Sequence, residues 1–130
     1  KASQKNGIVQ KWMFTMPYNR GEVVLVLFPD SNLQTAKRRP ALVIQANSIG
    51  TGLSQTIVAM ITSNLARAGH PSRVLVDITT PAGKQTGLLT NSVIMTDNIV
   101  TVLDSEIDRA IGFWSDMASV DVALRHTLGL

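Results

Sequence analysis

Several absences in the sequence narrow the possible functions. There is no cysteine, so disulfide bonds and thiol chemistry are excluded. No apolar run is long enough to span a bilayer and no signal-peptide pattern opens the chain, so we expect no membrane partner and a cytoplasmic location. Aromatic residues make up only 5% of the chain. Most of them fall at residues 12–18 and 113–114, which is a poor supply for a platform that stacks nucleic-acid bases.

Motifs for nucleotides, metals and nucleophilic hydrolysis are also missing. The sequence has no phosphate-binding Walker loop, no dinucleotide glycine pattern and no serine elbow of a hydrolase. The two histidines lack zinc-site spacing. His70 belongs to a Gly-His-Pro loop and His126 to the end of an expected helix, and nothing in the sequence brings them together as an acid–base pair. His126 is better explained as a cation near a helix C-terminus.

Three alternating acids imitate the start of a calcium loop without completing it. Asp104, Glu106 and Asp108 have the right spacing, but Arg109 stands where the turn glycine belongs and Ser115 where the closing glutamate belongs. These acids are better explained as charges at a helix start. We therefore expect no metal and no cofactor.

The composition that is present indicates one globular domain. The chain has 130 residues, of which 45% are hydrophobic and 16% charged. Residues 1–19 are polar with few anchors and are predicted to be a peripheral extension, followed by a domain over 20–130. Residues 1–45 carry seven Lys/Arg and two acids, whereas 46–130 carry five Lys/Arg and seven acids. The front part is therefore a plausible polyanion-binding face, although chance surface charge gives the same asymmetry.

Hydrophobic periodicity predicts strands early in the chain and helices late. The expected strands cover 22–28, 41–45, 56–62, 73–78, 92–96 and 99–103, the expected loops 30–37 and 79–90, and the expected helices 105–110 and 116–128. Met117, Val120, Leu124 and Leu128 form one apolar stripe on the last helix, which Gly129 can end. The fold class is all-β to α+β, and short strands at this spacing favour a small barrel or sandwich.

A cationic run before a buried strand is the strongest candidate for a binding site. Lys37, Arg38 and Arg39 end against Pro40, which favours an extended backbone at Arg39, and the apolar strand that follows anchors this arginine at the mouth of the fold. A guanidinium suits phosphate better than an ammonium does. Thr62 and Ser63 place hydroxyl groups at the end of another strand. A surface salt bridge and a routine strand-end hydroxyl remain alternatives for Arg39 and Thr62.

Four blocks stand in a fixed order along the chain: Arg39-Pro40-Ala41-Leu42-Val43-Ile44, Ile61-Thr62-Ser63, residues 91–97 (Asn-Ser-Val-Ile-Met-Thr-Asp) and residues 122–130 (Val-Ala-Leu-Arg-His-Thr-Leu-Gly-Leu). Together they resemble the MazF/PemK toxin family. The opening at residues 20–26 is also similar to that family's first strand. The resemblance spans Arg20 to the C-terminus.

The resemblance implies a mainly β fold, a small SH3-like barrel with a C-terminal helix, that forms a homodimer. It implies a ribosome-independent, metal-independent endoribonuclease that cuts single-stranded RNA at short sequences and is neutralised by a cognate antitoxin. Arg39 and Thr62 match the family's catalytic positions, and residues 30–38 match a mobile flap. Lys37, Arg38, Gln34 and Ser63 are the implied RNA-binding residues. The chemistry is consistent, because RNA carries its own 2′-hydroxyl nucleophile and a fixed guanidinium stabilises charge developing on the phosphate.

Some positions depart from the family's pattern and leave the general base unassigned. Gln34 lies nearest to a flap position where some members have a carboxylate, that loop has no histidine, and Val100 stands where some members have arginine. Asp97 is a possible participant, although an acid closing a turn at a strand end is favoured.

Two other functions remain open on the same fold. The chain could be a non-enzymatic toxin that binds a topoisomerase through its terminal helix and the Phe113-Trp114 pair, as gyrase poisons do. It could also be a degenerate member that only binds its antitoxin.

Overall fold

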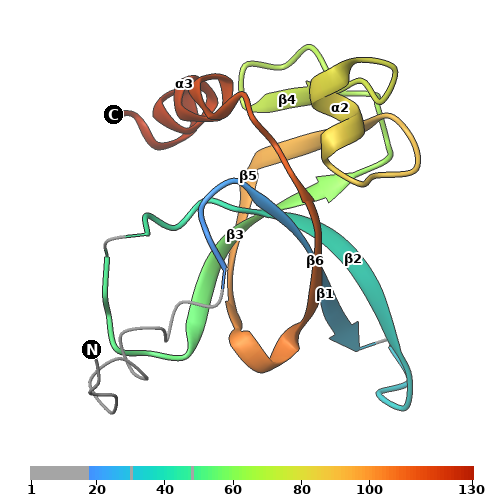
Figure 1. The fold of residues 1–130 in the computed structure, drawn as a ribbon, viewed down its shortest axis with the longest axis vertical. Coiled ribbons are helices and arrows are strands. Elements are labelled where there is room, and N and C mark those ends of the chain that lie inside the picture. Colours follow the sequence, from blue (N-terminus) through green and yellow to red (C-terminus); the bar gives the residue numbers. More distant parts are fainter. Residues whose placement is uncertain (1–17, 30, 48) are drawn as a thin grey trace, which may run out of the picture.

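The computed structural model describes residues 18–29, 31–47 and 49–130. The expected extension over 1–19 therefore lies almost wholly outside the described residues. The described elements, in chain order, are β1 (Glu22–Pro29), β2 (Ala36–Val43), β3 (Gln55–Thr62), β4 (Arg73–Val76), α2 (Pro81–Gln85), β5 (Ser92–Leu103), the 3-10 turn η1 (Asp104–Glu106), β6 (Ile107–Phe113) and α3 (Met117–Leu128) (Figure 1). The fold is mainly β with a C-terminal helix, as predicted.

All six strands join one antiparallel sheet in the order β4-β5-β3-β2-β1-β6. The sheet curves strongly, so that β1, β2, β3, β5 and β6 surround one lower core, while α3 and α2 lie beside β4 at the other end (Figure 1). Both faces of the central strands are buried, because Val23 belongs to the core cluster beneath α3 and Val24 to the cluster inside the curved sheet. This explains why β1 and β3 read as apolar throughout instead of alternating.

Helix α3 packs on the core cluster that contains Val23 and Leu42, which we call the upper core cluster. Its N-cap is Asp116, whose side chain accepts a hydrogen bond from the Ser119 N–H, and it ends at Gly129 in the left-handed conformation with φ 70°. Val120 and Ala123 are its buried residues. The predicted apolar stripe is therefore correct near its start, but Leu128 is 54% exposed. No helix among the described residues is long and apolar enough to cross a membrane.

Three predicted elements were wrong in their extent. Strand β2 begins at Ala36, so the cationic run lies within the strand and not in the preceding loop. The two strands expected over 92–103 are one bent strand, β5, whose pairing with β3 shifts register between Ala59 and Ile61. The loop expected over 79–90 contains α2, which begins after the N-cap Thr80 with Pro81 in its first turn.

The helix expected over 105–110 is also wrong. After η1 the chain extends as β6, because its backbone pairs with β1 from Glu22 to Val26. Pairing with a neighbouring strand overrides a weak local preference for helix.

A loop between α2 and β5 packs closely against β6. A Cβ atom at Gly87 would lie 2.2 Å from the Ile111 carbonyl oxygen, and one at Gly112 would lie 2.2 Å from the Gln85 oxygen. Gly87 also has φ 75°, which favours glycine. These contacts hold residues 85–87 against β6, and residues 87–90 line one pocket together with the ends of β2 and β3.

Candidate active site

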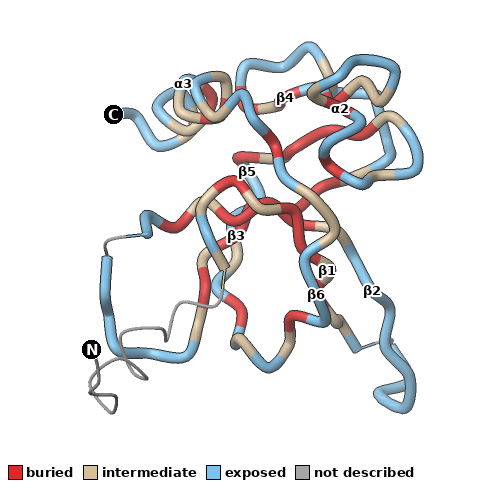
Figure 2. Tube along the Cα trace, in the orientation of Figure 1, coloured by how far each residue is buried: buried red, intermediate tan, exposed pale blue. Residues whose placement is uncertain are grey.

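Strand β2 changes from exposed to buried along its length. Residues 36–39 are exposed, whereas Ala41, Leu42 and Val43 are fully buried (Figure 2). Arg39 is therefore extended, as Pro40 predicts, and pairs with Val26 of β1. The buried half of the strand anchors a charged half that projects past the core.

The ends of β2 and β3 bring Arg39 and Thr62 to the same place. The two strands pair antiparallel with Ala41 opposite Met60. Continuing that register by two residues sets Arg39 opposite Thr62 on the same face of the sheet. Two residues that are 23 positions apart in the sequence thus meet at one edge of the fold.

Two adjacent pockets share both residues. The central pocket, of about 550 Å³, is lined by apolar residues that include Leu25, Ile61 and Ile111, and by residues 87–90. The inner pocket, of about 360 Å³, is also lined by Met60 and Met95, which belong to or pack against the core cluster inside the curved sheet. Arg39, Ile61 and Thr62 line both pockets and form the shared wall. A ligand group placed at this wall would contact a guanidinium and a hydroxyl together.

The Thr62 hydroxyl is oriented by the loop that follows it. Its Oγ1 accepts a hydrogen bond of 3.1 Å from the Asn64 backbone N–H. Since a hydroxyl has one proton and two lone pairs, the Thr62 O–H remains able to donate to a ligand.

The cations at this edge differ in whether their charge is already paired with an acidic side chain. Within the part of the chain that the structure describes, the Arg39 guanidinium has no hydrogen bond or ion pair. Arg38, by contrast, donates through Nε to Asp108 Oδ2 at 3.0 Å. Arg39 is therefore free to bind an anion, and the surface salt bridge considered for it is not found among the described residues.

The predicted RNA-binding residues do not all gather at the shared wall. Arg38 and Ser63 line the central pocket, and Lys37 lines a flap pocket of about 490 Å³ that also includes Arg39. Gln34 lines none of these pockets, and its backbone N–H donates to Asn32 Oδ1 in the exposed turn.

Arg109 lines the central pocket and was missed from the sequence. It fell in the region that was expected to be helical. The stretch from Ile107 to Phe113 does not alternate strictly between apolar and polar residues, so the sequence carried no clear strand signal that could have placed it.

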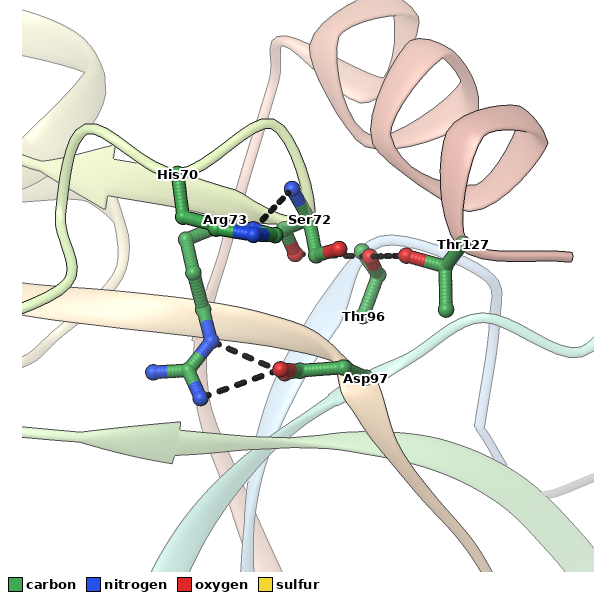
Figure 3. Close-up of polar contacts among 6 residues, drawn as sticks. All are labelled: His70, Ser72, Arg73, Thr96, Asp97 and Thr127. Atoms are coloured by element: carbon green, nitrogen blue, oxygen red, sulfur yellow. Dashed lines mark hydrogen bonds and ion pairs between the residues drawn. The ribbon is translucent and has the colours of Figure 1, made fainter.

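A separate polar cluster lies between β4, β5 and the end of α3. Figure 3 shows the two hydrogen bonds that Arg73 donates to Asp97, from Nε to Oδ1 at 2.8 Å and from Nη2 to Oδ2 at 3.1 Å. The hydrogen bonding from Arg73 lowers the pKa of the Asp97 carboxyl below its ordinary value, against a smaller opposing effect of burial. The prediction that Asp97 closes a turn was wrong, because Asp97 lies within β5 and its side chain reaches back to β4.

The two histidines are neighbours, contrary to expectation. Their ring centroids lie 6.1 Å apart in an edge-to-face arrangement. The loop before β4 lies near the last turn of α3. In the same region the hydroxyl of Thr96, in β5, and that of Thr127, in α3, are 2.8 Å apart (Figure 3). Neither His70 nor His126 lines the central or inner pocket, so the pair does not serve the chemistry at Arg39.

The described residues offer no obvious metal centre. Over 18–29, 31–47 and 49–130, no three His, Cys, Asp or Glu side chains gather closely enough to hold an ion. A free guanidinium and an oriented hydroxyl are groups that can bind and stabilise a phosphate.

The fold and the site define a small, mainly β protein whose sheet edge carries an arginine and a threonine hydroxyl beside a pocket. The sequence model described as PemK-like, MazF-like toxin of type II toxin-antitoxin system matches residues 19–128. The chain belongs to this toxin family.

Curated relatives match over most of the chain. Endoribonuclease MazF2 of Mycobacterium bovis is 38% identical over 119 residues, which is 88% of this chain and 100% of the relative. Endoribonuclease EndoA of Bacillus subtilis is 35% identical over 119 residues, covering 88% of this chain and 97% of the relative.

Solved structures share the fold. The MazE-MazF crystal structure from Deinococcus radiodurans superposes with a TM-score of 0.67, covering 87% of this chain and 97% of that chain at 20% identity. An endoribonuclease in complex with its cognate antitoxin, from a mycobacterial species, gives a TM-score of 0.65 at 23% identity over 87% of this chain and 96% of that chain.

Proposed function

We propose that this chain is a metal-independent endoribonuclease toxin that cleaves single-stranded RNA and is neutralised by a cognate antitoxin protein. Membership of the toxin family supports this function, as does the activity named for its curated relatives. The observation that carries the assignment to particular residues is that Arg39 and Thr62 are the polar residues of the wall shared by the central and inner pockets.

The reaction needs little from the protein beyond placement and charge. The 2′-oxygen of the substrate attacks the adjacent phosphorus, and the bond from phosphorus to the 5′-oxygen breaks. The 2′-hydroxyl loses a proton and the departing 5′-oxygen gains one, which leaves a 2′,3′-cyclic phosphate and a 5′-hydroxyl. Negative charge develops on the phosphate oxygens during the attack, and this is the charge that the site must stabilise.

Arg39 and Thr62 take different parts in this step. The Arg39 guanidinium stabilises the charge on the phosphate, and the Thr62 hydroxyl donates a second hydrogen bond to it. Arginine is a poor proton donor because its pKa lies above about 12. No described residue lining the central or inner pocket is Asp, Glu or His, so we assign charge stabilisation and not proton abstraction to these pockets.

The cationic run at residues 37–39 extends the site beyond Arg39. Lys37 adds a charge in the flap pocket next to Arg39, which favours an extended polyanion over a single phosphate group. We place the substrate strand along this edge. We also propose that the toxin acts as a homodimer in the cytoplasm, where RNA and antitoxin are both present.

The protein-binding alternative receives less support. It relied in part on Trp114, which is only 7% exposed and belongs to the upper core cluster. Phe113 remains 46% exposed, but one exposed ring is a small anchor for a partner.

The test is incubation of the purified protein with a long RNA in the presence of EDTA, followed by mapping of the cut ends. The proposal predicts cuts at a short recurring sequence, with cyclic phosphate on one side and 5′-hydroxyl on the other. Intact RNA, or cleavage that stops when EDTA is added, would overturn it.

A further inference from the structure

One carboxylate oxygen accepts hydrogen bonds from two arginines that line the central pocket. Asp108 Oδ2 accepts a hydrogen bond from Arg38 Nε at 3.0 Å and another from Arg109 Nη1 at 2.7 Å. Its second oxygen has no partner within the described ranges. Both arginines line the pocket that contains Arg39 and Thr62. The structure therefore marks a point beside the proposed active site where one anionic oxygen contacts two arginines.

A β-bulge creates this arrangement. Leu25 of β1 pairs with Arg109, but the next residue, Val26, pairs with Ile107. Asp108 is thus an extra residue in β6, left out of the pairing. A bulge re-aims the side chains at its position, which explains how consecutive residues of a strand direct their charged groups to the same side. Arg38 reaches the same point from β2, on the other side of β1.

The ion pairs at this point are weak enough to be exchanged. The side chains of Arg38 and Arg109 are 56% and 61% exposed, and that of Asp108 is 26% exposed. Ion pairs so open to water contribute little to stability. A phosphate group offers more acceptor oxygens than the single one used here, and it suits the arginine donor fork.

We propose that Arg38 and Arg109 form a second phosphate-binding site of the toxin, which Asp108 occupies in the free protein. A phosphate of the RNA strand other than the scissile one displaces the Asp108 carboxylate and binds the two arginines, while Arg39 and Thr62 hold the scissile phosphate. Asp108 thereby lowers the affinity for RNA in general and favours strands that reach both sites. The inference rests on the proposed RNA substrate and adds Arg109 and Asp108 to the residues that determine binding.

The test uses Asp108→Asn in the full chain. The probe is a short single-stranded RNA that contains the mapped cleavage sequence and carries a 2′-O-methyl group at the scissile position, so that it binds without being cut. Removing the competing charge should raise the affinity about fivefold, because exposed ion pairs are worth up to about 1 kcal/mol. The matched control is Asp121→Asn, which changes the charge equally and frees Arg20, a residue that lines none of the pockets described above.

Arg109→Gln supplies the opposite change. It should weaken binding and reduce the slope of log affinity against log salt by about 0.7, the value for one phosphate contact on a single strand. The double variant that combines Arg109→Gln with Asp108→Asn should lose most of the rise in RNA affinity expected for Asp108→Asn alone. Thermal melting of each variant checks that the fold is retained.

The outcomes separate this inference from the proposed function. Equal gains in Asp108→Asn and Asp121→Asn, or an unchanged salt slope in Arg109→Gln, would overturn the second phosphate site while the wild-type protein still cleaves RNA. Absence of cleavage by the wild-type protein defeats the nuclease proposal itself.

Discussion

Two arginines beside Thr62 differ in whether their charge is already paired within the fold. Arg73 borders a loop pocket that also includes Thr62, and its guanidinium is gripped by both oxygens of Asp97. Arg39 lies on the other side of Thr62 and has no such partner among the described residues. The Arg73 side chain is 15% exposed, whereas Arg39 is exposed on the open half of β2.

The difference lies in what each arginine stabilises. Arg73 joins β4 to β5, so its charge is satisfied before any ligand arrives. Arg39 is held only through its backbone, by the buried residues that follow it in β2. Its charge is thus unpaired among the described residues and available to a ligand, as the proposed stabilisation of a charge that develops during a reaction requires. This comparison predicts that replacing Arg39 affects activity and replacing Arg73 affects stability.

The largest expected effect is the loss of activity in Arg39→Ala. Cleavage should fall by roughly 100-fold or more, since a preorganised charge donor is removed from the phosphate. The melting temperature should stay within a degree or so, because no described contact is lost. Arg125→Ala, an exposed arginine on α3, is the control and should cleave as the wild type does. Near-normal cleavage by Arg39→Ala would contradict the assignment.

The second effect is that of Thr62→Val on cleavage. Valine keeps the shape of the side chain but removes the donor, and a hydrogen bond to a charged group contributes about 1.5–3 kcal/mol, so the rate should fall at least 10-fold. Single-turnover rates give the measurement. Thr101→Val, at an exposed position of β5, should leave the rate unchanged. A rate loss shared by both variants would indicate a general effect on the sheet.

The third effect is a loss of stability in Arg73→Ala. Removing the guanidinium leaves Asp97 without its partner, and the free energy of unfolding should fall by about 1 kcal/mol, or a few degrees in melting temperature. Cleavage should change only a few-fold. A loss of cleavage as large as that in Arg39→Ala, with no change in melting, would show that Arg73 belongs to the active site.

The smallest effect is the pH dependence of the Arg73–Asp97 pair. Because the pKa of Asp97 is lowered in the folded protein, its contribution to stability is present above the unfolded pKa of about 4. It is lost as the pH falls through the folded pKa, where the folded carboxylate is protonated. The melting temperatures of the wild type and Asp97→Asn should therefore differ at pH 7 and converge below pH 4. A constant difference across this range would refute the linkage.

The strands that are buried on both faces were the easiest elements to predict. Val23 to Leu27 and Ile57 to Ile61 are continuous apolar runs, because two core clusters share these strands. The end of α3 also followed from a local residue, Gly129, whereas Asp116, predicted as its first residue, is its N-cap. Local sequence was sufficient wherever burial or capping acts within a few neighbouring residues.

The errors arose where distant pairing decides the structure. Residues 107–110 form a strand because they pair with β1, more than 80 positions earlier. The contact between His70 and His126 depends on the packing of α3 against the loop before β4. The resemblance to the family indicated Arg39 and Thr62 as partners, but it did not indicate Arg109, whose position depends on the bulge at Asp108.

The central claim is that Arg39 and Thr62 act on one phosphate. A double-mutant cycle of Arg39→Ala and Thr62→Val on the single-turnover cleavage rate tests it most directly. If both groups stabilise the same charge, the double variant should lose much less than the product of the two single losses. Losses that multiply in full would mean that the two residues act independently and would contradict the account.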